Sequence, residues 1–168
     1  MKIIALSGYA GSGKDTVGEY LVHRYNYFRI AMADALKTKV NSEFSIPPGY
    51  PKDLELPGSS QTPRDLYIKV GNFYRSIDTD FWIKQLYFHP DTRYVITDLR
   101  FRSELLYLSN KFGYQVLTIR VDRFSESRID DISEKDLDGV TMDYTLPNRG
   151  TIKELYKSID QIMEGLGV

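Results

Sequence analysis

The residues best suited to chemistry form one run near the N-terminus, Gly8-Tyr9-Ala10-Gly11-Ser12-Gly13-Lys14-Asp15-Thr16. The run matches G-x-x-x-x-G-K and lies between a short apolar segment and a segment with helical character, as that motif requires. Glycines let the backbone curl so that successive N–H groups point inward at phosphate oxygens, and the following helix adds its unpaired N-terminal donors. The run therefore predicts a phosphate-binding loop, and the alternative is a glycine-rich turn without a ligand.

The ionisable residues of the loop suggest how it binds the phosphates and the metal ion of a nucleotide. Lys14 supplies a mobile ammonium group for the β- and γ-phosphates of a nucleotide. The motif normally has Ser or Thr after the lysine as a magnesium ligand, but this chain has Asp15 there and Thr16 one position later. We expect Asp15 to contact Mg²⁺ or its water shell and Thr16 to contact a phosphate, and both are candidate metal ligands.

A second cluster, Asp98-Leu99-Arg100-Phe101-Arg102, follows an apolar run that predicts a strand, Arg93–Thr97. Ligands bind at the carboxyl ends of the strands in a parallel α/β sheet. Asp98 can hold magnesium or its waters there, and Arg100 and Arg102 bring positive charge to the same place. The alternative role for Asp98 is to cap the helix that begins near Phe101, but the coincidence of Asp and Arg at a strand end favours a site.

A third set of candidates lies on the predicted helix Thr62–Ile77. At about 100° per residue, Arg64 and Arg75 fall on one line with Gly71 between them, roughly opposite an apolar face. That face consists of Leu66, Val70, Phe73 and Ile77. Two guanidinium groups beside a residue without a side chain would form a groove for a phosphate or sugar. A solvated basic face is the commoner fate of such arginines.

Arginines also occur at and beyond the end of the fourth predicted strand, Gln115–Val121. Arg123 and Arg128 stand among Asp and Glu residues in a segment, Asp122–Gly139, that shows no clear core element, and Arg120 is grouped with them from the end of the strand. The segment could be a lid that closes over phosphates and excludes water. On spacing alone, a solvated loop with self-compensating charge is favoured.

Composition narrows the class of protein. The 168 residues fit one domain, and 42% hydrophobic with 27% charged residues is typical of a globular protein. The net charge of −1 gives no bulk positive field, which argues against a nucleic-acid partner. The absence of cysteine excludes disulfides and thiol nucleophiles. No window resembles a membrane span or a signal peptide, so we expect a cytoplasmic protein without a membrane partner.

The remaining elements alternate in type. Strands are predicted at Lys2–Ser7, Tyr27–Ala31 and Met142–Leu146, and helices at Gly13–Tyr25, Asp34–Val40, Asp80–Phe88 and residues 152–163. Five of the seven prolines lie between Glu43 and Pro63, which predicts a long loop. Strands that alternate with helices indicate an α/β fold with a parallel sheet covered on both faces.

Several segments together resemble the bacteriophage-type deoxynucleoside monophosphate kinases. They are GYAGSGKDT, ADALK at Ala33–Lys37, PRDLYIKVGNFYRSIDTDFW at Pro63–Trp82, TDLRFRSE at Thr97–Glu104 and DYTLPNRGTIKEL at Asp143–Leu155. The resemblance touches most of the chain in the right order. GKDT and TDLRF are its most specific parts, whereas Glu43–Gln61 and the charged segment match poorly.

The resemblance implies a three-layer P-loop fold, with five parallel strands in the order 2-3-1-4-5. It implies one domain, residues 1–168, with a monophosphate-binding arm at about 34–90 and a lid at about 122–140. By analogy Asp34 and Lys37 begin the arm, Arg64, Gly71, Arg75 and Trp82 line the acceptor pocket, and Asp98 and Arg100 lie between the two phosphates. Arg120, Arg123 and Arg128 would be lid residues, and Asn148 and Gly150 would hold the adenine of ATP.

The expected reaction is phosphoryl transfer from ATP, with Mg²⁺, to a nucleoside monophosphate. Lys14, Arg100, Arg123 and Arg128 are the expected catalytic residues. A kinase for another phosphorylated metabolite, such as phosphomevalonate or dephospho-coenzyme A, and an NTP-binding switch remain alternatives. A switch has no need for a second phosphate pocket. The sequence does not determine which bases the enzyme accepts or whether the chain forms a homodimer. A phage-encoded enzyme would act in the host cytoplasm.

Overall fold

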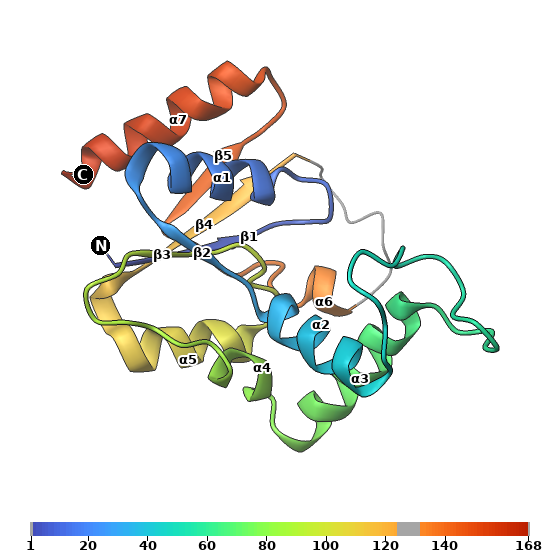
Figure 1. Cartoon of the computed structure of the whole chain (residues 1–168). Helices are drawn as coiled ribbons and strands as arrows, with labels where there is room; N and C mark the ends of the chain where they lie inside the picture. Colours follow the sequence, from blue (N-terminus) through green and yellow to red (C-terminus); the bar gives the residue numbers. More distant parts are fainter. Residues whose placement is uncertain (1, 124–131, 168) are drawn as a thin grey trace. The chain divides into compact units, whose positions relative to one another are not determined.

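The computed structural model describes residues 2–123 and 132–167. The chain divides into two compact units. Met1–Ile30 and Phe88–Val168 form the sheet unit, and Ala31–Tyr87 form the helical unit. Figure 1 shows the ribbon coloured along the sequence.

The sheet unit contains five parallel strands in the order β2-β3-β1-β4-β5. These strands are β1 (Ile3–Ser7), β2 (Phe28–Ile30), β3 (Tyr94–Ile96), β4 (Val116–Asp122) and β5 (Tyr144–Pro147). β1 is buried throughout, because it lies at the centre with neighbours on both sides. The strand order predicted from the resemblance is therefore confirmed. Because all five strands are parallel, the connections after β1, β3, β4 and β5 all begin at the same end of the sheet, where the carboxyl ends of the strands lie.

Helices cover both faces of this sheet. α1 (Lys14–Tyr25) and α7 (Ile152–Gly165) lie side by side on one face, and α5 (Arg102–Phe112) lies on the other, as Figure 1 shows. α1 buries Val17 and Leu21, and α7 buries residues spaced by four, so each helix presents an apolar stripe to the strands. A short 3₁₀ turn, η1 (Gly113–Gln115), links α5 to β4.

The helical unit contains α2 (Met32–Glu43), α3 (Pro63–Ile77) and the short α4 (Phe81–Lys84). α3 begins as its sequence predicts, because Thr62 accepts from the Asp65 N–H while the Asp65 carboxylate accepts from the Thr62 N–H, and Pro63 takes the first helical position. Between α2 and α3 the chain forms no helix or strand, which confirms the predicted long loop. Val40, Ile46 and Leu66 form this unit's small core.

The apolar face predicted for α3 is only half correct. Leu66 is buried, but the Phe73 and Ile77 side chains are 60% and 68% exposed. The C-terminal half of the helix instead turns Gly71 and Tyr74 inward. There Tyr74 stacks on Phe81 at 4.3 Å between ring centroids. Ring stacking and packing against α2 therefore outweigh the four-residue apolar repeat at this end of the helix.

Two further predictions need correction. The helix predicted at Asp80–Phe88 spans only Phe81–Lys84, because the backbone leaves the helical conformation after Gln85, which is its C-cap. The charged segment after β4 contains a short helix, α6 (Ile132–Lys135), and buries Glu134 and Leu137. The charge of this segment had suggested a fully solvated loop.

Candidate phosphate-binding site

The loop between β1 and α1 has the backbone shape that its glycines predict. Gly8 and Gly13 have φ angles of +133° and +105°, a region that side chains disfavour. A Cβ at Gly8 would lie 2.4 Å from the Val121 carbonyl oxygen, and one at Gly13 would lie 2.4 Å from Asn148 Nδ2. Both glycines are therefore required for conformation and for close approach. Within the described residues, the buried Ser12 Oγ has no hydrogen-bond partner.

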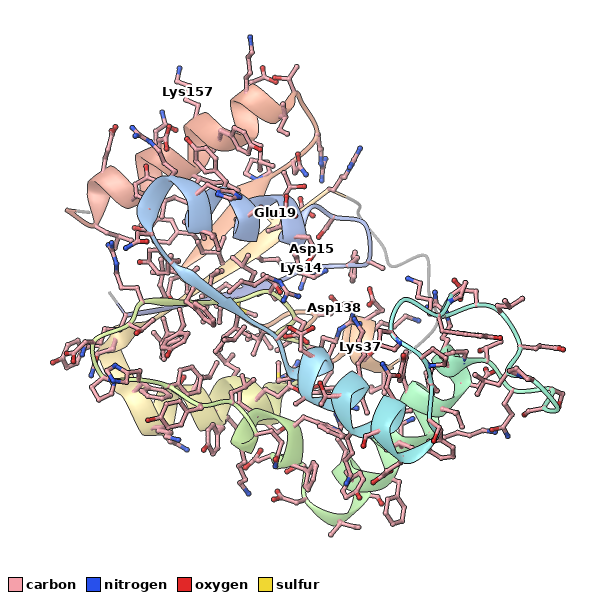
Figure 2. The ribbon with its side chains drawn as sticks, viewed as in Figure 1. Lys14, Asp15, Glu19, Lys37, Asp138 and Lys157 are labelled. Atoms are coloured by element: carbon pink, nitrogen blue, oxygen red, sulfur yellow. The ribbon has the colours of Figure 1, made fainter. Side chains whose placement is uncertain are left out.

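Lys14 lies at the centre of this loop, in the first turn of α1 beside the exposed Asp15, as Figure 2 shows. Its Nζ donates to the carbonyl oxygens of Gly8 at 2.6 Å and Tyr9 at 2.9 Å. Burial lowers the pKa of Lys14, and the Arg100 charge lowers it further. The negative charges of Glu134, Asp15 and Asp98 act in the opposite direction. The structure thus brings the predicted residues Asp15, Asp98 and Arg100 into the electrostatic neighbourhood of the loop lysine.

The Asp98–Arg102 cluster lies directly beyond β3, at the expected sheet edge. Asp98 does not cap the next helix, because α5 begins at Arg102 and its N-cap is Phe101. The buried Glu104 carboxylate accepts from the backbone N–H groups of Arg100 at 2.9 Å and Phe101 at 3.1 Å. Glu104 therefore fixes the backbone from which the Arg100 side chain projects.

The acidic segment, residues 132–139, contacts both of these clusters. The Glu134 carboxylate accepts from the Ala10 N–H at 2.6 Å and from Arg100 Nη1 at 2.5 Å. Asp136 accepts from the backbone N–H of Arg102 at 2.7 Å, and the Arg102 side chain donates to the Asp136 carbonyl at 2.7 Å. The Arg100 guanidinium thus pairs with a carboxylate, whereas the Arg102 guanidinium donates to main-chain carbonyl oxygens of the segment.

Arg120 belongs to a strand and not to the loop after it. It lies within β4, paired in register with Ser7 at the end of β1. Its guanidinium lies 5.0 Å from the centroid of the Tyr9 ring and donates to Asp138 at 2.8 Å. The Tyr9 hydroxyl donates to the same carboxylate at 2.9 Å, which joins the phosphate loop to the acidic segment. The assignment of Arg120 to the lid segment was therefore wrong, because backbone pairing fixes it in the sheet.

The loop after β5 also reaches the phosphate loop. Asn148 Nδ2 donates to the Ser12 carbonyl oxygen at 2.8 Å. Gly150 follows, just before Thr151, whose side chain forms a capping box with Glu154 at the start of α7. Asn148 is thus adjacent to the predicted nucleotide loop, as the adenine assignment requires. The assignment itself stays a prediction.

The acceptor candidates all lie in the helical unit. Arg64 is exposed and donates through Nε to Asp53 at 2.5 Å. Gly71 is buried against Leu36, and a Cβ there would lie 3.3 Å from Arg75 Nη1. Trp82 is buried and donates through Nε1 to the Gly71 carbonyl at 3.1 Å. The open groove expected over Gly71 is therefore filled by Leu36, although Arg75 does lie beside the glycine.

The remaining candidates are placed as follows. Asp34 and Lys37 are exposed on α2, one turn apart. Gly11 is an exposed loop residue, Thr16 is half-buried in α1, and Arg123 is exposed directly after β4. Arg128 lies outside the described residues. Among residues 2–123 and 132–167, no three His, Asp or Glu side chains form a metal cluster, and no helix is long and apolar enough to cross a membrane.

The glycine loop, the Asp98–Arg102 cluster and Arg120 lie at the carboxyl end of the sheet, where β1 lies between β3 and β4. The crossover from β1 leads to β2 on one side and the crossover from β3 leads to β4 on the other, so the direction of the connections reverses there, which is the position where open α/β sheets bind ligands. The glycine loop, the buried Lys14 ammonium group and arginines from β4 and from the residues after β3 lie together there. Such a set of donors suits a polyphosphate anion.

Comparison with solved structures agrees with this topology. Shikimate kinase from Aquifex aeolicus has a TM-score of 0.52 at 18% identity and covers 98% of each chain. Shikimate kinase from Acinetobacter baumannii has a TM-score of 0.53 at 13% identity, over 98% of this chain and 94% of that one. The fold is that of the P-loop kinases. At these identities the likeness extends to the fold alone.

Sequence comparison finds similarity to a viral protein. The chain is 29% identical to a protein of Acanthamoeba polyphaga mimivirus described as "Putative deoxynucleotide monophosphate kinase", over 95% of this chain and 94% of that protein. No protein-family model matches the sequence. The specific bacteriophage-type resemblance stays a prediction.

Three residues of the site were missed by sequence analysis: Tyr9, Glu134 and Asp138. Tyr9 occupies a variable position of the loop motif, so its identity carries no signal there. Glu134 and Asp138 belong to a run of alternating charges, in which no spacing separates a buried carboxylate from a solvated one. Only the return of the segment to the sheet edge reveals them.

Proposed function

We propose that this protein is a deoxynucleoside monophosphate kinase that transfers the γ-phosphoryl group of ATP to a (d)NMP. The observation that carries the proposal is the Gly8–Thr16 loop with its buried Lys14, beside Asp98 and Arg100 at the end of β3. A nucleoside triphosphate supplies the polyphosphate that this set of donors can bind. The mimivirus relative supports the acceptor class.

In the proposed reaction, an oxygen of the acceptor phosphate forms a bond to the γ-phosphorus while the bond to the β–γ bridging oxygen breaks. ADP leaves with that electron pair. The acceptor oxygen is largely ionised near pH 7, because the second pKa of a phosphate monoester is about 6. No general base is needed, so the chain's contribution is alignment and charge neutralisation.

Each residue of the site has one proposed task. The loop amides and Lys14 hold the triphosphate, and Arg100 neutralises charge that develops between donor and acceptor. Arg120 supports the loop through Tyr9, and Arg123 and Arg128 remain the lid candidates. Arg64, Arg75, Asp34 and Lys37 are proposed to bind the acceptor.

The donor set also fits Mg²⁺. Magnesium in phosphotransferases is held by one or two carboxylates together with the substrate phosphates, so a three-carboxylate cluster is not required. Asp15 and Asp98 both act on the Lys14 charge, and Thr16 lies in the same turn of α1 as Asp15. These three residues would hold the ion, which would supply charge neutralisation on the phosphates.

An acceptor panel tests this function. ADP release from ATP with Mg²⁺ is measured with each common ribo- and deoxyribonucleoside monophosphate, and with phosphomevalonate and dephospho-coenzyme A. We expect one or more deoxynucleoside monophosphates to accelerate release strongly and to yield the diphosphate. Acceleration only by a non-nucleotide acceptor, or slow hydrolysis that no acceptor accelerates, would contradict the proposal.

A further inference from the structure

The Glu134 carboxylate is engaged by two donors of the phosphate site. Its side chain is only 3% exposed. One oxygen accepts from the Ala10 N–H at 2.6 Å, and the other accepts from Arg100 Nη1 at 2.5 Å. A main-chain amide of the phosphate loop and a strand-end guanidinium thus share one buried anion.

An anionic side chain in this place has a specific consequence. The Ala10 N–H is a single donor, so a carboxylate oxygen and a phosphate oxygen cannot both accept its full hydrogen bond. Two anions held a few ångströms apart in a partly buried site also repel each other strongly. A triphosphate bound with its γ-phosphate near Ala10 and Arg100 would therefore have to displace Glu134.

We propose that Glu134 is an internal competitor of the nucleoside triphosphate. The inference rests on the proposed function and adds a regulatory element to the same site. Glu134 holds the Ala10 amide and Arg100 while the triphosphate is absent, and it withdraws when the triphosphate binds. Binding of a triphosphate to the phosphate loop would thereby release Glu134, and with it this contact of the acidic segment.

The other carboxylates of the acidic segment fit the competitor role of Glu134, because their hydrogen bonds do not involve the main-chain amides of the phosphate loop. Asp138 accepts from the Tyr9 hydroxyl and from Arg120, and Asp136 accepts from the Arg102 backbone. These carboxylates bind side chains or the start of α5. Among the described carboxylates of residues 132–139, Glu134 alone accepts a hydrogen bond from a main-chain amide of the Gly8–Thr16 loop.

The size of the effect follows from linkage. The apparent dissociation constant equals the intrinsic constant divided by the fraction of molecules in which Glu134 has withdrawn. A bond between a charged group and its donor is strong enough to keep that fraction at about a tenth or less. Removing the charge should therefore tighten binding by about tenfold.

The test compares Glu134→Gln with Asp136→Asn by isothermal titration calorimetry, using ATP with Mg²⁺ and, separately, inorganic triphosphate. Asp136 is the matched control, since it anchors the same segment without touching the phosphate loop. We expect Glu134→Gln to bind both probes about tenfold more tightly than the wild type. Asp136→Asn should change the affinity by less than about twofold.

Three results would overturn the competitor role: weaker binding by Glu134→Gln, unchanged binding, or an equal gain in Asp136→Asn. The last would mean that loosening the segment, not removing the anion, improves binding. If Glu134→Gln does not fold, Glu134→Ala also removes the anion that holds the Ala10 amide and Arg100, and the same gain is expected. A wrong kinase assignment can be distinguished from a wrong competitor role. The affinity for inorganic triphosphate measures the competition with Glu134 and does not depend on phosphoryl transfer.

Discussion

Asn148 donates through Nδ2 to the backbone carbonyl of Ser12 at 2.8 Å, and the same amide nitrogen lies against Gly13. The loop after β5 therefore holds the phosphate loop from outside. Asn148→Ala removes this support, and we expect the KM for ATP to rise by about five- to tenfold. Steady-state kinetics with varied ATP measure the change. Arg149→Ala is the control, because Arg149 forms an exposed pair with Asp122 and should leave the KM unchanged. Equal effects of the two variants would contradict the supporting role.

The protonation of Lys14 sets a limit to nucleotide binding at alkaline pH. Burial lowers its pKa from the usual 10.5, so the ammonium form is lost at a lower pH than in an exposed lysine. Affinity for triphosphate should therefore fall as pH rises through this lowered pKa. Binding in that range should take up protons, because the bound phosphates raise the lysine pKa. Calorimetry in two buffers of different ionisation enthalpy measures the uptake, and no uptake at any alkaline pH would refute this prediction.

Arg75 lies beside the buried Gly71, within 3.3 Å of a Cβ built there. We expect Arg75→Ala to raise the KM for the acceptor about tenfold or more, with little effect on the KM for ATP, because a charged hydrogen bond to the acceptor phosphate is lost. Lys84→Ala in the same unit is the control, since Lys84 forms an exposed pair with Asp78. Equal changes in both Michaelis constants would argue against an acceptor role. Arg64→Ala tests the second arginine in the same way.

The interface of α1 with α7 contains a pH-dependent contact. The Tyr25 and Tyr20 hydroxyls both donate to Asp160, and burial together with the Asp160 carboxylate raises the pKa of Tyr25 to about 12. A raised tyrosine pKa stabilises the fold fully below pH 10, and this contribution is lost as pH rises toward about 12. Tyr25→Phe should lower the free energy of unfolding at pH 8 by about 1–2 kcal/mol. Urea titrations at pH 8 and at alkaline pH measure this difference, which should shrink above pH 10. A constant difference would contradict the assignment.

Much of the fold could be predicted from local patterns. The apolar run before Gly8 and the glycine spacing determine β1, the phosphate loop and the start of α1. Thr62 and Pro63 correctly predict where α3 begins, since capping and proline geometry depend on a few adjacent residues. The strand order came from the resemblance, because pairing between distant segments leaves no trace in the periodicity of either one.

The parts that escaped prediction depend on long-range contacts. Phe73 and Ile77 continue the apolar repeat of α3, yet Tyr74 and Gly71 take the inward positions because α2 and Phe81 are available to pack against them. Glu134 is buried because Arg100 and the Ala10 amide, more than thirty residues and more than a hundred residues away in the chain, meet it at the sheet edge. Its neighbours in sequence are ordinary charged residues.

The most direct test of the phosphate-loop assignment is transfer of ³²P from [γ-³²P]ATP to a deoxynucleoside monophosphate by Lys14→Ala, with the wild type alongside and folding checked by circular dichroism. Because the Lys14 ammonium is the charge at the centre of the loop, we expect a folded variant whose rate of transfer is at least about a thousandfold lower. A folded Lys14→Ala protein that forms labelled diphosphate at close to the wild-type rate would contradict the account.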